Sequence, residues 1–534
     1  MVSQQYASDP AFQTLFPLPT STGNVTLPGP THESAKLLVD KLKHNFVHNH
    51  VTFVPETGVH NHVVDDMLAV YALGGSAKLL ENIYDDHQKY QIPLFKTGPV
   101  TEDNFLEHVG DHEYYEAFLV YFCNYLLSHT LTETLERFVF ANEFNYVPDL
   151  DKVIEEGRNY GEMGTKKQPE MLNRFLAALL HPYIHLAYGV EFGIPATFAE
   201  GLAQTAIHVA HQTELIPPIL FMSGTPLVGL SKLNLDAIAS KAKGSRPPFF
   251  SLHQALFDDD ALSHTALMIS PEGIPDYRNV LKSAGDKIFE HANVWYDSWL
   301  TGITDIEEIE SRIEHMVEEI IFGNLLWYGA SGWAHRKTEE RKLNADFFTM
   351  HFVTSSMFLP NLVLPNSNAR TLQPPLSQRS RLLLLRSYLA TCAGWYVARG
   401  RPALPIAEFY AATEKLLVPP PSISNPNPVS GEQKLFWTPG HARAVGMSPW
   451  ARVWANTIVH PNEHLHKLVR ACGAFANWYG GREKGYYAVG QGGLPGREVI
   501  DGTLPLRVAV ITLERLGWAY EGGELEQWDC DGLF

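Results

Sequence analysis

The stretch TDIEEIESRIEHMVEEIIFGNLLWYGA, Thr304 to Ala330, decides the fold class of this 534-residue chain. Its apolar residues recur at intervals of three and four, the spacing that places side chains on one face of an α-helix. They are Ile306, Ile309, Ile313, Met316, Val317, Ile320 and Ile321. Thr304 and Glu307 have the spacing of a capping box, so we expect the helix to begin there.

The same helical spacing recurs along the chain, in SAKLLVDKLKHNF (34–46), EMLNRFLAALL (170–180) and SRLLLLRSYLATCAGWYVARG (380–400). Gly400 and Pro402 supply stop signals for the last of these. Alternating patterns bounded by Asn-Gly or Asp-Gly turns, which are typical of strands, are scarce. The sequence therefore predicts a mainly α protein.

We expect one large helical body with irregular Pro- and Gly-rich loops. An extended N-terminal segment (1–34) precedes a helical domain (35–480), and a Gly-rich C-terminal segment (481–534) packs on the same body. VPPPSISNPNPVSGEQ, residues 418–433, is too rich in Pro, Ser and Asn for a helix and is expected to be an exposed excursion. No repeat of fixed period occurs, which argues against a solenoid.

Composition narrows the function classes. A formal net charge of −18 without a basic cluster argues against nucleic acid as a partner. No signal peptide and no uncharged apolar stretch long enough to span a bilayer are found, so we expect a cytoplasmic protein with no membrane partner. The four cysteines form no CxxC pair, which disfavours a disulfide framework or a cysteine zinc site.

Several common catalytic signatures are missing. The run with Gly490, Gly492 and Gly496 is a loose echo of a dinucleotide loop, but it lacks a good strand before it and a long helix after it, so we interpret it as an irregular loop. The sequence contains no P-loop, HExxH or GxSxG motif. Only Glu463 and His466 have the Glu-x-x-His spacing, which excludes a di-iron bundle that needs two such pairs.

The chain carries 24 histidines, many of them on helical segments. In HPYIHLAYGVEFG, His181 and His185 lie four residues apart and hence on one helix face. They either hold one ion or sit in a polar seam, and the spacing leaves both interpretations open. Glu200 lies eight residues before His208, also on one face. Further candidates are His60, His62, Asp65, Asp66, His211, His351, His460, His464 and His466. Imidazole and carboxylate without thiolate suit iron, zinc, copper or nickel.

Six blocks occur in the order and spacing of one known family: HNHVVDDMLAVYALGGS, HVGDHEYYEAFLVYF, LLHPYIHLAYGVEFGIPATFAEGLA, DFFTMHFVTSS, YVARGRP and SPWARVWANTIVHPNEHLHKLVRA. From about residue 35 to residue 480 the chain resembles the questin oxidase-like family. The resemblance implies a mainly helical oxygenase that opens an anthraquinone- or xanthone-type ring of an aromatic polyketide, by Baeyer–Villiger-like insertion or by dioxygenation. It implies a small-molecule substrate and O2 as partners, and it leaves the oligomeric state open.

The resemblance also implies site residues. It points to His62, His181, His185 and His351 as ligands of a non-haem Fe(II), with His464 in reserve. NADPH is linked to some members.

The chain departs from the family pattern at two places. Asp65 and Asp66 stand where members often have histidine, and Tyr388 aligns with a carbamylated lysine of some members. We therefore take Asp65, His464 and Tyr388 as candidate catalytic positions.

Two alternatives stay open beside the iron enzyme. One is a metal-independent, NADPH-using Baeyer–Villiger-type monooxygenase, and the other is a non-catalytic helical binding protein with a degraded site. A flat polycyclic substrate needs an aromatic, mostly apolar pocket. The stretches NLLWYGASGWAH (324–335) and SSMFLPNL (355–362) are candidate walls for it, or ordinary core.

Overall fold

The computed structural model describes residues 9–19, 23–25, 27–54, 59–148, 168–222, 228–230, 247–270, 272–336, 338, 342–365, 372–417, 448–489 and 493–533. The predicted excursion over 418–433 lies outside these residues. The fold is mainly α, as the periodicity predicted. In the described part the strands are confined to one antiparallel pair, β1 (Thr52–Val54) and β2 (Val59–His60).

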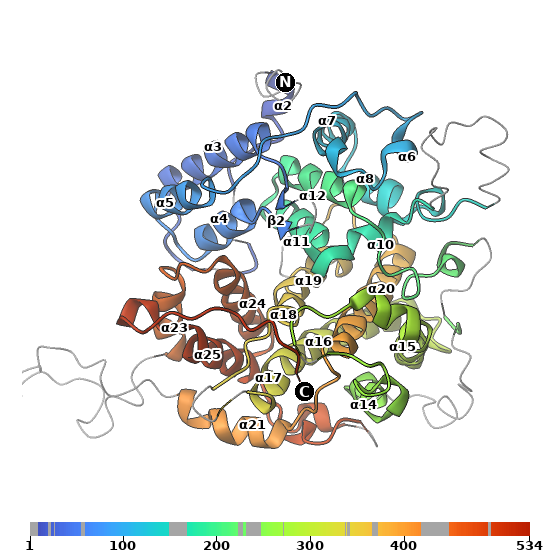
Figure 1. Cartoon of the computed structure of the whole chain (residues 1–534), viewed down its shortest axis with the longest axis vertical. Helices are drawn as coiled ribbons and strands as arrows, with labels where there is room; N and C mark the ends of the chain where they lie inside the picture. The colour runs from blue at the N-terminus through green and yellow to red at the C-terminus, as the bar shows by residue number, and fades with distance from the viewer. Residues whose placement is uncertain are drawn as a thin grey trace, which may run out of the picture.

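Helices of eight or more residues form most of the body (Figure 1). They are α3 (His32–His48), α4 (Val63–Ala72), α5 (Ala77–His87), α7 (Tyr115–Leu126), α11 (Ala177–Phe192), α12 (Pro195–Ile207), α14 (Ser251–Asp258), α15 (Tyr277–Leu300), α16 (Ile306–Leu325), α20 (Gln378–Ala398), α21 (Ile406–Thr413), α23 (Pro449–Thr457), α24 (Glu463–Tyr479) and α25 (Leu504–Leu516). Shorter helices are α2 (Pro10–Gln13), α6 (Phe105–His108), α8 (Leu131–Leu135), α10 (Met171–Phe175), α17 (Ser331–Ala334), α18 (Met350–Ser356) and α19 (Leu359–Val363).

Four helices that are far apart in the sequence meet in the interior. Helix α4 packs on α11 and α24, and α18 packs on the same two helices, so the four close a ring. In Figure 1, α18 and α24 lie directly below α4 and α11. Every residue of α4 and of α18 is buried. A helix that is buried on all sides lies in the interior of a large protein. The ring of four helices is therefore the centre of this fold.

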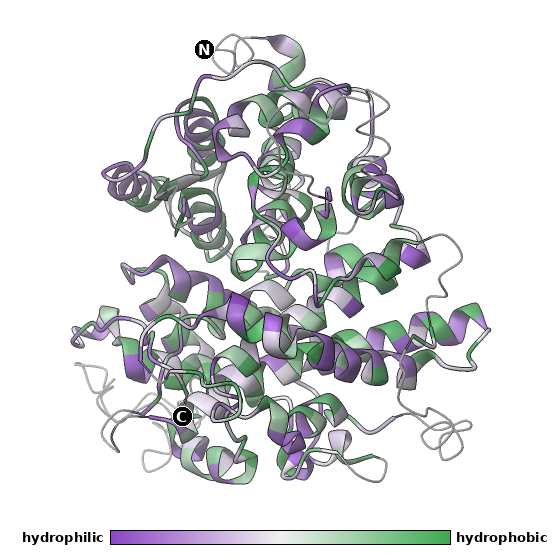
Figure 2. Cartoon of the chain, turned by 45° about the vertical axis from the view of Figure 1, so that its right-hand side comes forward, coloured by the Kyte–Doolittle hydropathy of each residue, from purple (hydrophilic) through white to green (hydrophobic). Residues whose placement is uncertain are grey.

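Amphipathic helices cover this centre. In α3, buried Leu38, Leu42 and Phe46 alternate with exposed polar residues, and α5, α15 and α16 have the same character. Figure 2 shows hydrophilic and hydrophobic residues interleaved along many helices of the body. Helix α25, from the C-terminal segment, packs on α24. No helix in the described ranges is long and apolar enough to cross a membrane.

Helix α16 confirms the predicted helix but begins one residue late. The N-cap is Asp305, whose side chain accepts a hydrogen bond of 2.9 Å from the backbone N–H of Glu308, so the predicted capping role of Thr304 was wrong. An aspartate at the N-cap also places a negative charge at the positive end of the helix. The predicted stop after α20 is confirmed, because the helix ends at Ala398 and Gly400 has a φ of +104°.

The predicted helix over residues 170–180 is broken. Helix α10 ends at Phe175, and Ala178, Leu179 and Leu180 follow with φ of +49°, +56° and +68°. Three consecutive residues other than glycine thus adopt the left-handed conformation, which costs about 1–2 kcal/mol per residue. The leucine spacing fits either conformation, because it reports burial and not handedness.

Candidate metal centre

Each helix of the central ring contributes one imidazole to the same buried region. His62 is the N-cap of α4, His181 lies in α11, His351 in α18 and His464 in the first turn of α24. Nitrogen atoms of His62, His181 and His464 lie within 4.8 Å of one another, and all three residues are buried. The ring of His351 completes the group, with its centroid 4.8 Å from that of His181 and 5.3 Å from that of His464. We call these four residues the histidine centre.

Three of these rings are held at Nδ1 and free at Nε2. His181 Nδ1 donates to the backbone carbonyl of Ala178, and His351 Nδ1 donates to that of Phe347 over 2.8 Å. His464 Nδ1 lies 3.0 Å from a carboxylate oxygen of Glu463. Each Nε2 is buried and has no hydrogen-bond partner in the described part of the chain. An acceptor on one ring nitrogen fixes the tautomer and aims the lone pair of the other, which is how metal-binding histidines are oriented.

The burial of the centre keeps its rings neutral. Burial lowers the pKa of His62, His181 and His351 well below the ordinary value of 6.5, and neighbouring cations and imidazoles lower it further. The pKa of His464 is lowered by burial and by Lys467, although Glu463 opposes this. A neutral imidazole has the lone pair that a metal ion needs. The donor set therefore fits a first-row transition metal such as iron, zinc or copper.

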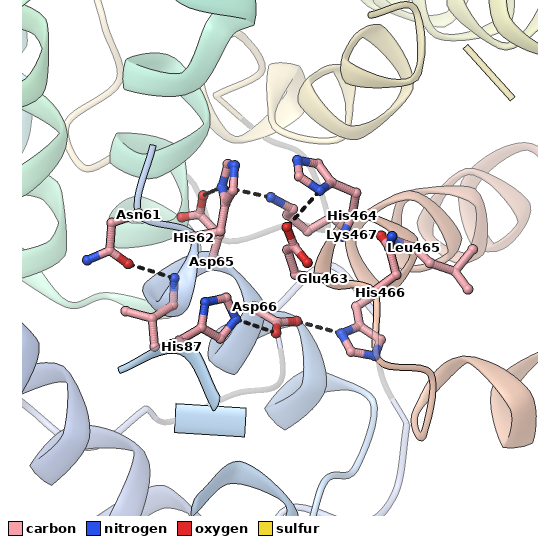
Figure 3. A network of polar contacts seen from close by, with 12 residues as sticks. Asn61, His62, Asp65, Asp66, His87, Glu463, His464, Leu465, His466 and Lys467 are labelled. Carbon is pink, nitrogen blue, oxygen red and sulfur yellow. Dashed lines mark hydrogen bonds and ion pairs between the residues drawn. The ribbon is translucent and has the colours of Figure 1, made fainter. Parts of the chain in front are cut away.

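His62 has charged neighbours of both signs. Its Nδ1 lies 3.1 Å from Nζ of Lys467 and 3.7 Å from a carboxylate oxygen of Asp65. Figure 3 shows both residues beside the His62 ring. Burial lowers the pKa of Lys467 and raises that of Asp65. Asp65 is one of the predicted site residues, whereas Lys467 is not. The signal available for Lys467 was its place three residues after His464, on the same face of the helix.

His185, one turn after His181, has different partners. Its Nδ1 lies 3.4 Å from Asp65 and its Nε2 lies 3.3 Å from Glu200, so both ring nitrogens face carboxylates. Burial disfavours the charged ring, but the two carboxylates outweigh it, and the pKa of His185 is raised. The structure thus places His185 beside the histidine centre with no nitrogen directed at it.

Glu200 contacts His185 and not His208. Helix α12 ends at Ile207, so His208 is the residue after it, and the helical face that was expected to join Glu200 and His208 does not extend that far. Nε2 of His208 instead lies 2.7 Å from Nε2 of His60. The His60 ring stacks on His181 at a centroid distance of 4.1 Å and so walls one side of the histidine centre.

The structure does not bring Tyr388 to the histidine centre. Its hydroxyl group lies 2.7 Å from Ser355 Oγ and donates to the backbone carbonyl of Phe352 over 3.2 Å. These contacts attach α20 to α18, the helix that carries His351. Burial raises the pKa of Tyr388 well above 10, so the hydroxyl stays protonated.

A cleft of about 890 Å³ opens beside the centre, and His62 and His464 are part of its wall. Its apolar lining consists of Phe53, Val59, Leu79, Ile83, Tyr90, Phe347, Ile458, Val459, Pro461 and Trp528. Its polar lining includes Asp66, His87, His460, Asn462, Glu463 and His466. None of the predicted wall residues 324–335 and 355–362 lines this cleft, and most of them belong to the buried core.

The glycine run does not form a dinucleotide loop in the described residues. Gly496 precedes a short 3₁₀ turn, Arg497–Val499, and not a long helix. Gly490 and Gly492 lie outside the described residues.

The chain matches known proteins over most of its length. A model of the questin oxidase-like family matches residues 59–472. A questin oxidase of Aspergillus fumigatus is 27% identical over 70% of this chain and 72% of its own length. A questin oxidase of Aspergillus terreus is 25% identical over 80% and 78%. A Baeyer-Villiger oxidase of Paecilomyces divaricatus is 29% identical over 67% and 66%. We therefore assign the chain to the oxygenases and set the non-catalytic alternative aside.

Proposed function

The chain belongs to the questin oxidase-like family, and we propose that it inserts oxygen into a hydroxylated aromatic polyketide and opens its ring, with an iron ion at the histidine centre and O2 as the oxidant. One observation carries the proposal. The Nε2 atoms of His181, His351 and His464 are buried without a hydrogen-bond partner in the described residues, and they belong to rings packed against one another. Such atoms cost about 1–3 kcal/mol each unless something binds them.

We propose His62, His181, His351 and His464 as the residues that hold the ion. This set keeps three of the four ligands implied by the resemblance and takes His464 in place of His185, because both nitrogens of His185 already face carboxylates. A bound Fe(II) would supply the activation of dioxygen. The chain's own task is to fix the four rings. The carbonyls of Ala178 and Phe347 and the carboxylate of Glu463 do this at the second nitrogen of three of them.

The cleft suits the proposed substrate. Its volume of about 890 Å³ falls within the range of about 300–1,000 Å³ for small-molecule sites. The aromatic rings of Phe347 and Trp528 line it beside His464, at centroid distances of 5.0 and 6.5 Å from that ring. A flat polycycle that lies on these rings is therefore next to the histidine centre.

Metal analysis combined with oxygen uptake tests the proposal. The purified protein should contain about one iron ion per chain, and a hydroxyanthraquinone should stimulate its oxygen consumption. Removal of the ion by a chelator should abolish the uptake, and Fe(II) should restore it. Full oxygen consumption by iron-free protein would contradict the proposal.

The second candidate is the metal-independent oxygenase with NADPH as reductant. The observation in its favour is Lys467, whose Nζ lies 3.1 Å from His62 Nδ1 and brings a potential cation to the place where the ion would bind. It predicts that iron-free protein consumes oxygen with substrate only when NADPH is added. The iron enzyme predicts no uptake in that sample, with or without NADPH.

A further inference from the structure

One wall of the cleft comes from the C-terminal end of the chain. After α25 and the short 3₁₀ turn Ala519–Glu521, residues 523–533 continue without a helix and with a single strand bridge at Asp529. We call residues 523–533 the C-terminal strap. Gln527, Trp528 and Cys530 of the strap line the cleft, and they lie beyond residue 472, where the family match ends. The strap therefore adds to the cleft a wall that the family match does not cover.

The strap is fixed to the body at Asp529. Its carboxylate accepts hydrogen bonds of 2.9 Å and 3.1 Å from Arg515, and one of 2.8 Å from the backbone N–H of Ala345. The backbone of Asp529 donates to the carbonyl of Ala345 over 2.9 Å and accepts from the N–H of Phe347 over 2.8 Å. Asp529 and Arg515 are both buried. A bidentate ion pair of this kind holds its partners in one geometry, so the neighbouring Trp528 has a fixed position.

Trp528 is also tied to the helix that carries His464. Its indole N–H donates to the side-chain oxygen of Asn462 over 2.9 Å, and the same oxygen accepts from the backbone N–H of His464 over 3.1 Å. Asn462 is the N-cap of α24. The centroid of the Trp528 ring lies 6.5 Å from that of His464. Trp528 is half-buried and lines the cleft, so it presents an aromatic surface there beside the histidine centre.

A fixed indole ring recognises the shape of a ligand. Flat aromatic systems stack on it in an offset arrangement, with a gain beyond the apolar area that they bury. Because the ring of Trp528 is held before the ligand arrives, little side-chain freedom is lost on binding. A fused three-ring system is flat throughout, whereas two aryl rings joined by one carbonyl are twisted and only one of them can lie flat on the indole. The indole therefore distinguishes flat from twisted aromatic ligands.

We propose that Trp528, held by the C-terminal strap, is the residue that determines the specificity of the cleft, by stacking on the substrate and selecting flat fused rings over twisted ones. This inference rests on the proposed function for the chemical class of the ligand, an aromatic polyketide. Opening the central ring of a flat three-ring substrate leaves two aryl rings that twist apart. The same residue therefore favours binding of the substrate over retention of the ring-opened product.

A pair of matched ligands tests this selection without turnover. The first, 2-hydroxyanthraquinone, is flat. The second, 4-hydroxybenzophenone, has the same phenol and aryl ketone groups but lacks the second carbonyl bridge, so its rings are twisted. Their affinities for the whole protein are measured by calorimetry in the absence of oxygen. We expect the wild-type protein to bind the flat ligand about tenfold more tightly, the effect of one aromatic stack.

Two substitutions separate stacking from the hydrogen bond to Asn462, because both of them remove the indole N–H. Trp528→Leu keeps an apolar side chain but has no flat face. The ratio of the two affinities should therefore fall to about one, through weaker binding of the flat ligand. Trp528→Phe keeps a flat ring, so most of the preference should remain. Thermal unfolding checks that both variants fold.

Trp450, a half-buried tryptophan that packs on Trp454 outside the cleft lining, provides a matched control, because Trp450→Leu should leave both affinities unchanged. An unchanged ratio in Trp528→Leu, or a wild-type protein without a preference for the flat ligand, would overturn the inference. So would an equal loss of preference in Trp528→Phe, which would assign the preference to the hydrogen bond.

Oxygen uptake separates the two proposals. Iron-dependent uptake with an unchanged ratio in Trp528→Leu refutes the role of Trp528 alone. A preference that depends on Trp528 without iron-dependent uptake refutes the proposed function and leaves the role of Trp528 standing.

Discussion

His181 and His185 lie one turn apart in α11 and are both buried, yet their surroundings are opposite in kind. His181 has a backbone carbonyl on Nδ1, and its Nε2 lies among three other imidazoles without a hydrogen-bond partner in the residues that the structure describes. His185 has a carboxylate on each side, 3.4 Å and 3.3 Å away. Burial lowers the pKa of His181 far below 6.5, whereas Asp65 and Glu200 raise that of His185 despite its burial. The spacing puts both rings on one face, and the partner of the second nitrogen decides which of them is suited to a metal.

The largest difference is expected in activity. His181→Asn removes an Nε2 donor from the histidine centre, so iron should no longer be retained and turnover should fall at least ~1,000-fold, since the effect of losing one ligand resembles the loss of a catalytic group. Metal analysis and oxygen uptake measure this. The exposed His129 provides a control, because His129→Asn should leave both quantities unchanged. Iron content equal to that of the wild type in His181→Asn would contradict the assignment of His181, rather than His185, as a metal ligand.

The next difference is expected in stability. His185→Asn leaves the carboxylates of Asp65 and Glu200 buried without the ring between them, and an uncompensated buried charge costs on the order of 3 kcal/mol. Urea unfolding should show this loss in the free energy of unfolding while the iron content is retained. Loss of iron with unchanged stability would return His185 to the ligand set that the family resemblance implied.

The two variants should also differ in the sign of their pH dependence, measured on iron-free protein. The lowered pKa of His181 means that the unfolded chain takes up a proton first as the pH falls below 6.5, which reduces stability. As the pH falls from 7.5 to 5.5, the free energy of unfolding of His181→Asn should therefore rise by about 1.4 kcal/mol relative to that of the wild type. The raised pKa of His185 stabilises the fold fully below pH 6.5 and loses this effect as the pH rises through the folded pKa. His185→Asn should therefore be more destabilised at pH 5.5 than at pH 7.5. Unfolding curves of equal pH dependence would contradict the assignment.

The smallest effect concerns the left-handed turn before His181. Ala178 has a φ of +49°, and glycine adopts this conformation without the cost that alanine incurs. Ala178→Gly should therefore raise the free energy of unfolding by about 1 kcal/mol. Ala451→Gly, at an exposed position inside α23, should lower it by about 1 kcal/mol, because the same change there costs helix propensity. Two changes of the same sign would show that the turn is not left-handed in solution.

The sequence predicted the helices well because the buried apolar residues of a helix recur every three or four positions. Helices α16 and α20 occur within a few residues of their expected bounds. It could not predict the turn at Ala178–Leu180, where the same leucine spacing accompanies a reversed backbone. The family resemblance supplied His62, His181 and His351, which the fold brings together. The resemblance could not show that Glu200 contacts His185, since this contact depends on how α11 and α12 pack. Lys467 escaped notice because a single lysine in a helix is most often exposed.

A crystal soaked in a cobalt salt and measured at the cobalt absorption edge tests the central claim most directly. We expect one buried anomalous peak that lies about 2.0–2.3 Å from a ring nitrogen of His62 and from Nε2 of His181, His351 and His464, as expected for metal–imidazole bonds. A peak between His185, Asp65 and Glu200, or no buried peak at all, would contradict it.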